Sequence, residues 1–106
     1  HNLAPYSFFN GFGSNPPIIG FSPALSGRTG EAKDTLINIR DTKKFTVSLV
    51  TNSFVEQMSL TASEYDSDID EFIKSGLHKF ICKDSNIPAV RESPFIMDCI
   101  LYKKNV

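Results

Sequence analysis

Short apolar stretches separated by turn-forming residues run along the chain and predict short strands and short helices. Apolar and polar side chains alternate from Phe45 to Leu49, which predicts a half-buried strand. Further strands are predicted over Leu3–Phe9, Ile18–Ser22 and Phe95–Tyr102, with a weaker one over His78–Lys83. Pro5 restricts the first of these to a sheet edge or a bulge, because proline has no backbone N–H. Turn chemistry is present at 10–11 and 13–17, and residues 23–33 are expected to form a loop.

Three short helices are predicted between these strands, over residues 34–40, 53–60 and 67–76. Asp34 is a suitable N-cap for the first helix, and Ser53 with Glu56 matches the capping-box pattern at the start of the second. Gly76 is a natural residue just past the end of the third helix. The order β-β-α-β-α-α-β-β lacks the regular rhythm of a doubly wound sheet. We therefore expect a mainly β protein with short helices, built as a small antiparallel barrel.

Charge is distributed unevenly and changes this picture. The 106 residues carry a net charge of −1, yet residues 1–27 contain no Asp, Glu, Lys or Arg. Such a stretch must be covered by the core, a partner chain or a ligand. The near-neutral balance argues against a nucleic-acid-binding surface, and the apolar runs are too short to span a membrane. The first residues also lack the basic start of a secretory signal peptide, so we expect a cytoplasmic protein.

Isolated candidates for chemistry are weak. Cys82 and Cys99 are seventeen positions apart, without the closer ligands that a metal site needs, and we expect two buried structural thiols. His1 and His78 are expected at the surface. The acidic run from Asp66 to Glu71 lacks the glycine and the final glutamate of a calcium loop, and therefore predicts a solvated helix start. We expect no metal site and no protein-borne catalytic group.

One constellation has more chemical content. Lys33, Asp34 and Thr35 lie where a glycine-containing loop enters a helix, and the unpaired N–H groups of a helix start can bind an anion. On these residues alone, an ordinary capped helix with a surface lysine is the favoured interpretation.

Four motifs, in order and at fitting spacing, indicate a more specific function than these three residues alone. They are N-L-A-P-Y-S-F-F at 2–9, N-P-P at 15–17, K-D-T-x-x-N-I-R at 33–40, and V-x-E-S-P at 90–94 leading into a strand with Cys99. Together they resemble the flavin reductase-like family of FMN-binding split β-barrel proteins. The resemblance implies a homodimer that binds one FMN per subunit near its interface. It also implies oxidoreductase activity in which NADH or NADPH donates electrons through the flavin.

The resemblance also implies roles for particular residues. It places the flavin ring against the strand of Ala4, Tyr6, Ser7 and Phe8, largely through backbone groups. It places the phosphate near Ser22, Lys33, Asp34 and Thr35. Lys33 and the Thr35 hydroxyl would hold the phosphate, with Asp34 acting as a cap. Tyr6 or Phe8 packs on the ring or fills the core. The charge-free first segment would then form the flavin wall and the dimer interface.

Members of that family begin upstream of the first motif and continue beyond the cysteine strand. We therefore expect residues 1–106 to form a single domain that is a piece of a longer barrel. Three alternatives stay open. The chain could be an FMN carrier without turnover, a split barrel for another phosphorylated cofactor such as an F420-type deazaflavin or pyridoxal phosphate, or an inactive truncated product that folds only as an oligomer.

Overall fold

The computed structural model describes residues 2–22, 34–62 and 69–102. Its elements are β1 (Phe9–Ser14), β2 (Pro17–Phe21), α1 (Asp34–Thr42), β3 (Lys44–Ser48), the 3-10 turn η1 (Asn52–Phe54), α2 (Val55–Thr61), α3 (Glu71–Ser75), β4 (Lys79–Ile81), β5 (Pro88–Val90) and β6 (Ile96–Ile100). This confirms the expectation of a mainly β protein with short helices. None of the helices among the described residues has the length and apolar character needed to cross a membrane.

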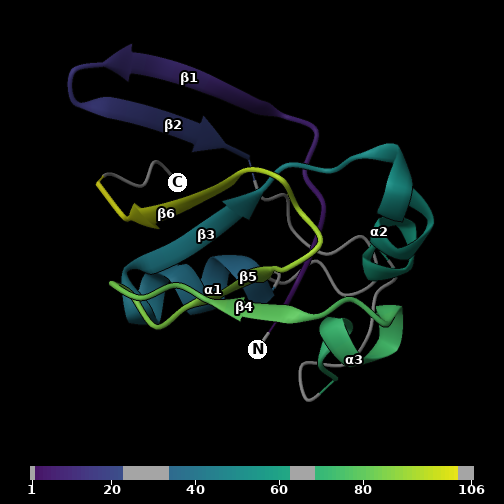
Figure 1. Cartoon of the computed structure of the whole chain (residues 1–106). Helices are drawn as coiled ribbons and strands as arrows, with labels where there is room; N and C mark the ends of the chain where they lie inside the picture. Colours follow the sequence, from purple (N-terminus) through teal and green to yellow (C-terminus); the bar gives the residue numbers. More distant parts are fainter. Residues whose placement is uncertain (1, 23–33, 63–68, 103–106) are drawn as a thin grey trace.

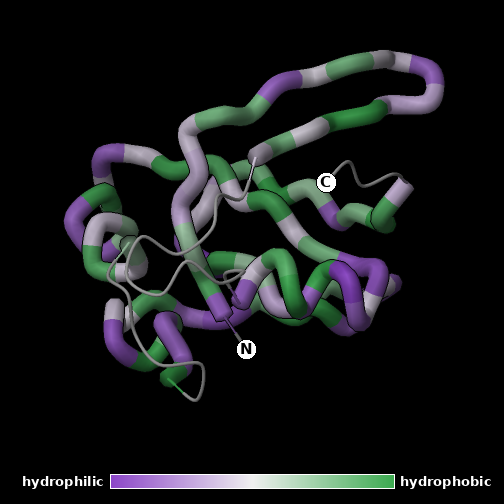
Figure 2. The backbone as a smooth tube through the Cα atoms, turned by 180° about the vertical axis from the view of Figure 1, so that it is seen from behind, coloured by the Kyte–Doolittle hydropathy of each residue, from purple (hydrophilic) through white to green (hydrophobic). Residues whose placement is uncertain are grey.

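The strands form three antiparallel pairs, β1–β2, β3–β6 and β4–β5. Two side chains of β3 connect it to β5: the Thr46 hydroxyl donates to the Pro88 carbonyl at 2.7 Å, and the Ser48 hydroxyl accepts the Val90 N–H at 3.1 Å. The pairs around β3 consequently form one body, with α1 on one side and α2 and α3 at one end (Figure 1). The β1–β2 hairpin extends away from this body in both views (Figures 1 and 2).

The core is small and lies where the helices meet β5. Phe54, Phe72, Leu77 and Val90 form its buried cluster, and Leu3 from the start of the chain packs against them. Burying each of these side chains contributes roughly 1.5–3 kcal/mol to folding. The segment that carries Leu3 is therefore attached to the core before it continues into the hairpin.

Most predicted strands are confirmed at nearly the expected positions, as β2, β3, β4 and β6. The prediction of a strand over Leu3–Phe9 is wrong, because strand pairing begins at Phe9 and the Leu3 N–H donates to a side chain instead. The turn predicted at residues 10–11 is also wrong. Asn10 and Gly11 pair with β2, and a register shift between Gly11 and Gly13 accommodates the glycine-rich stretch. The strand β5 was not predicted, because Pro88 at its start suggests a loop.

The helix signals were only partly correct. At the second helix the Thr51 and Ser53 hydroxyls bond to each other at 2.8 Å, and no side chain caps η1 or α2, so the predicted capping box is absent. At α3 the Asp70 carboxylate accepts the Phe72 N–H at 2.9 Å. Gly76 ends that helix with a φ of 78°, the left-handed conformation that glycine adopts most easily, as expected.

Candidate functional site

The residues from Asn2 to Phe8 form an extended segment that connects the helices to the hairpin (Figure 1). The Asn2 side chain joins it to α1, donating to Thr35 Oγ1 at 2.5 Å and accepting from Asn38 Nδ2 at 2.7 Å. The next residue joins it to α3, since the Leu3 N–H donates to Glu71 Oε1 at 3.0 Å. The structure thus brings together two of the motifs, N-L-A-P-Y-S-F-F and K-D-T-x-x-N-I-R, through hydrogen bonds between their own side chains.

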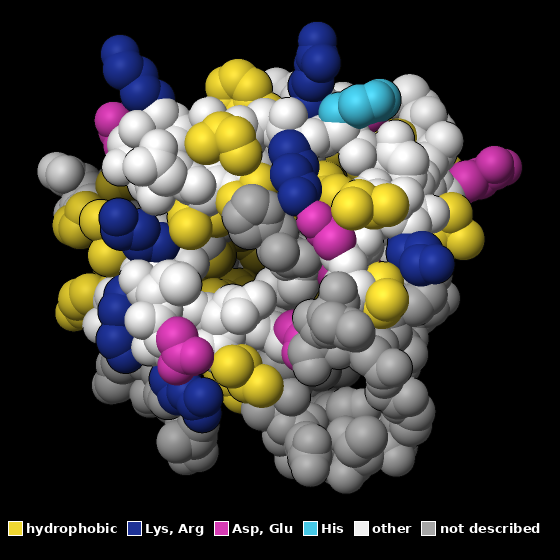
Figure 3. Space-filling view, turned by 90° about the horizontal axis from the view of Figure 1, so that it is seen from below, with side chains coloured by type: hydrophobic (Ala, Val, Ile, Leu, Met, Phe, Trp, Pro, Cys, Tyr) yellow, Lys and Arg dark blue, Asp and Glu magenta, His cyan; other side chains and the backbone are white. Residues whose placement is uncertain are grey.

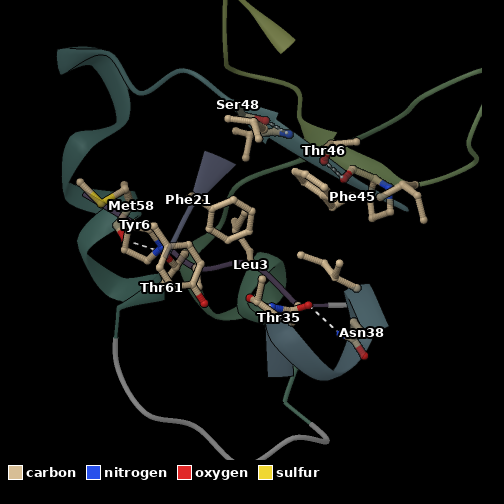
Figure 4. Close-up of a pocket in the computed structure, with 18 of the residues that line it drawn as sticks. Leu3, Tyr6, Phe21, Thr35, Asn38, Phe45, Thr46, Ser48, Met58 and Thr61 are labelled. Carbon is tan, nitrogen blue, oxygen red and sulfur yellow. Dashed lines mark hydrogen bonds between the residues drawn. The ribbon is translucent and has the colours of Figure 1, made fainter. Parts of the chain in front are cut away.

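A cavity of about 630 Å³ lies beside this segment. Its lining includes Ala4, Tyr6, Ser7 and Thr35 of the predicted site. The rings of Tyr6, Phe21 and Phe45 follow one another along it, with centroids 5.2 and 5.5 Å apart (Figure 4). A volume in this range and a mainly apolar, aromatic lining with a few polar groups are typical of small-molecule sites. Seen from below, the surface is hollowed, and hydrophobic side chains lie inside the hollow (Figure 3).

The segment also carries polar groups beside the cavity: the Tyr6 phenol and the backbone N–H groups of Ala4 and Ser7. Burial raises the pKa of the Tyr6 phenol, the carboxylates of Glu71 and Asp34 raise it further, and a hydrogen bond with Thr35 opposes the increase. The phenol therefore stays neutral at physiological pH. The backbone N–H groups of Ala4 and Ser7 have no hydrogen-bond partner among the described residues. These two donors lie on the same stretch of chain as the aromatic ring of Tyr6.

A second cavity, of about 1390 Å³, lies between the hairpin and β6. Phe8 and Ser22 line it, and Ser7 lines both cavities. The eight predicted site residues are thus divided. Three line only the first cavity, two line only the second and one lines both; Asp34 begins α1 outside both linings, and Lys33 lies outside the described residues.

The sequence analysis missed Glu71. It treated the acidic run at this helix start as solvated, whereas Glu71 is only 7% exposed. Burial raises the pKa of its carboxyl, the Leu3 hydrogen bond opposes this, and the charges of Asp34 and Asp70 add to the increase. A signal was available in the sequence: Glu71 directly precedes Phe72, and the first turn of an amphipathic helix has a buried side as well as a solvated one.

The two cysteines and His78 lie close to where the sequence predicted them. Cys82 is buried and Cys99 is half-buried, and burial raises the pKa of both thiols, which keeps them protonated. His78 is exposed, and its Nδ1 lies 2.7 Å from a Glu92 carboxylate oxygen. His1 and the residues 66–68 lie outside the described ranges. Within those ranges no group of three His, Cys, Asp or Glu side chains could hold a metal ion.

Similar proteins and structures agree with the geometry. The chain matches the flavin reductase like domain over residues 1–105. An uncharacterized protein of Aquifex aeolicus is 37% identical over 96% of this chain and 52% of its own length. The crystal structure of nitrilotriacetate monooxygenase component B from Bacillus cereus aligns with a TM-score of 0.90 and 31% identity, over 96% of this chain and 50% of that one.

A protein described as a flavin reductase with a split barrel domain, from Shewanella frigidimarina, aligns with a TM-score of 0.81 and 31% identity, over 96% of this chain and 48% of that one. The chain therefore spans about half the length of the proteins it matches. The fold is that of the split-barrel flavin reductases. The chain belongs to the flavin reductase-like family.

Proposed function

We propose that this chain belongs to an FMN-binding oxidoreductase that takes electrons from NADH or NADPH. The observation that carries the proposal is the segment Asn2–Phe8, which combines the family's first motif with aromatic side chains beside a cavity and with the N–H groups of Ala4 and Ser7, which have no partner in the described part of the chain. Bound FMN would supply the redox chemistry, as a hydride acceptor that passes electrons onward. The protein's contribution is to bind the flavin, orient it and limit its contact with water.

The described residues fit the ring of a flavin. Its polar edge needs hydrogen-bond donors, and the N–H groups of Ala4 and Ser7 are available on this segment. Its faces need apolar or aromatic contacts, which Tyr6 would provide from the first cavity or Phe8 from the second. The Tyr6 phenol is neutral at physiological pH and therefore places no charge beside the ring.

The phosphate is proposed to bind near Ser22, Lys33, Asp34 and Thr35. The first N–H groups of α1 and the positive end of its dipole favour an anion there. The Thr35 hydroxyl accepts from Asn2 and is hydrogen-bonded to the Tyr6 phenol, so donation to a phosphate would replace its bond to Tyr6. Asp34 is the first residue of α1 and not its predicted N-cap, since the cap position lies outside the described residues. Its carboxylate would repel a phosphate, so its proposed part is to complement the positive end of the helix dipole.

Lys33→Ala tests this end of the site. The substitution is expected to weaken FMN binding at least tenfold, and riboflavin binding by less than twofold, since riboflavin has no phosphate. Lys83→Ala is the matched control, because this exposed lysine follows β4. Equal losses for FMN and riboflavin would contradict the phosphate assignment.

We further propose a homodimer, in which the charge-free, aromatic hairpin contributes to the covered surface, and a cytoplasmic location.

The visible absorbance spectrum of bound FMN distinguishes a reductase from a carrier. Under anaerobic conditions NADH or NADPH should bleach the visible band of FMN bound to a reductase within seconds to minutes. Bound FMN that stays oxidised with both donors would favour the carrier. If the protein does not bind FMN, the result would favour a split barrel that binds another phosphorylated cofactor.

A further inference from the structure

Glu71 occupies an unusual position for a carboxylate. It is the first residue of α3, it is buried, and its Oε1 accepts the N–H of Leu3, which is 68 positions earlier in the chain. Burying a carboxyl group is unfavourable unless hydrogen bonds compensate. None of the Lys or Arg side chains in the described ranges forms an ion pair with it, so its compensation comes from backbone N–H groups, those of Leu3 and of Glu71 itself.

The neighbouring carboxylate has a different role. Asp70 accepts the Phe72 N–H and the Lys79 ammonium, the latter at 2.6 Å, and so caps α3 with a cation beside it. Glu71 has a bond to a distant part of the chain instead. That bond lies one residue before Ala4, where the proposed flavin contacts begin.

We propose that Glu71 is a positioning residue for the flavin site, which fixes the Asn2–Phe8 segment against α3 through the Leu3 N–H. The side chain of Leu3 packs on the core cluster and also lines the cavity, so its backbone determines where the segment passes between them. Asn2 fixes the same segment to α1. The two attachments on consecutive residues set the direction in which Ala4 and Ser7 present their N–H groups. This inference rests on the proposed function only in the statement that these residues face flavin.

The charged and titratable groups around Glu71 give the proposal a pH dependence. Tyr6 faces it from the segment, Asp34 from the start of α1 and Asp70 from its own helix, while Lys79 of β4 pairs with Asp70. Burial raises the pKa of Glu71 above its ordinary value of 4.5. The folded protein therefore holds this proton more tightly than the unfolded chain, and stability falls as the pH rises from 4.5 through the raised value.

Amide hydrogen exchange of the 106-residue chain without flavin tests the attachment directly. In Glu71→Ala the Leu3 N–H is expected to exchange at least tenfold faster, because a hydrogen bond to a charged acceptor is lost. In Glu71→Gln, whose amide oxygen still accepts, exchange should stay within threefold. Glu56→Ala, at an exposed glutamate of α2, is the control variant and should leave the exchange of the Leu3 N–H unchanged. The Cys82 N–H, which donates to Ile87, is the control amide and should exchange at the same rate in every variant. Unchanged Leu3 exchange in Glu71→Ala would overturn the proposal.

If Glu71→Ala does not fold, the wild type decides the question: relative to their intrinsic rates, its Leu3 N–H should exchange at least tenfold more slowly than its Ser7 N–H, and equal exchange of the two would overturn the proposal. In support, the unfolding midpoint of the wild type in urea should fall as the pH rises above 4.5, and Glu71→Gln should lose this fall. FMN titration is the second readout: Glu71→Ala should weaken binding at least tenfold and Glu71→Gln by less than threefold. If the wild type does not bind FMN, the proposed function fails, and the Leu3 exchange still decides the role of Glu71.

Discussion

The β1–β2 hairpin has no charged side chain but exposes most of its aromatic ones, whereas the region from α3 to β5 has many charged side chains and buries several of its apolar ones. The hairpin and the residues before it carry no charged side chain, yet Phe8 is 80% exposed and Phe12 is 70% exposed. The region from α3 to β5 carries many charges, yet Phe72 and Val90 are each only 3% exposed. Figure 2 shows hydrophobic positions along the projecting hairpin as well as in the body. Absence of charge therefore does not mark the core of this chain.

The difference between the two regions bears on which partner covers the charge-free stretch. The sequence left three possibilities: the core, a partner chain or a ligand. The core cluster takes only Leu3 from this stretch among the described residues. Because the chain spans about half the length of the proteins it matches, the rest of a longer chain is a candidate beside flavin and a second subunit. The difference between the regions can be tested by substitutions on each side.

The largest effect is expected in the core. Phe72→Ala should lower the free energy of unfolding by about 3–5 kcal/mol, because it leaves a cavity among buried side chains. Phe12→Ala, on the hairpin, should change it by less than about 0.5 kcal/mol. Urea unfolding of the two variants measures both values. Similar losses would mean that the hairpin is packed in solution as firmly as the core.

A smaller effect is expected at the start of α3. Burial opposes the shift, but the hydrogen bonds from Lys79 and Phe72 lower the pKa of Asp70 below its ordinary 3.8. Its contribution to stability is therefore present above pH 3.8 and lost as the pH falls through the lowered value. Asp70→Ala should cost about 1–2 kcal/mol at pH 7, and this cost should shrink as the pH falls below 3.8. A cost that does not change with pH in the acid range would contradict this role.

The end of the same helix should be slightly less sensitive. Gly76 has a φ of 78°, and a Cβ there would meet no neighbouring atom, so strain in the backbone is the only penalty. Gly76→Ala should destabilise the protein by about 1 kcal/mol. The measurement is again the urea midpoint, and an unchanged value would show that this turn relaxes at no cost.

The smallest effect is expected at the hairpin glycine that faces Phe12. A Cβ at Gly20 would lie 2.6 Å from the Phe12 ring, so Gly20→Ala requires the ring to move. Since Phe12 is exposed, it can move into solvent, and the loss should stay below about 0.5 kcal/mol. A loss above about 1 kcal/mol would show that the Phe12 ring is held in place.

The elements that the sequence predicted correctly are those with a local cause. Phe45 to Leu49 alternates as a half-buried strand does, and Gly76 supplies the conformation that a helix end needs. The errors have long-range causes. Leu3–Phe9 has the composition of a strand, but its first available N–H is taken by Glu71, which no local pattern can indicate. Likewise, Asn10-Gly11 has turn chemistry, but pairing with β2 outweighs it.

The candidate site was predictable in part for the same reason. The motifs identified Ala4, Tyr6, Ser7 and Thr35, which line one cavity. They did not indicate that Phe8 and Ser22 line a second one. Nor could they reveal how Asn2 connects two motifs 33 residues apart, since that contact depends on the fold. The motifs thus indicated the family from the sequence, whereas the contacts between their residues could be found only in the structure.

The most direct test of the central claim is the visible absorbance spectrum of the purified chain during titration with FMN. A bound flavin exchanges water for an apolar, hydrogen-bonding surface, so its absorbance bands should shift and sharpen with increasing protein, in a saturable way and at one FMN per subunit. Addition of NADH or NADPH without oxygen should then bleach the visible band. Spectra identical to those of free FMN at every protein concentration would contradict the account.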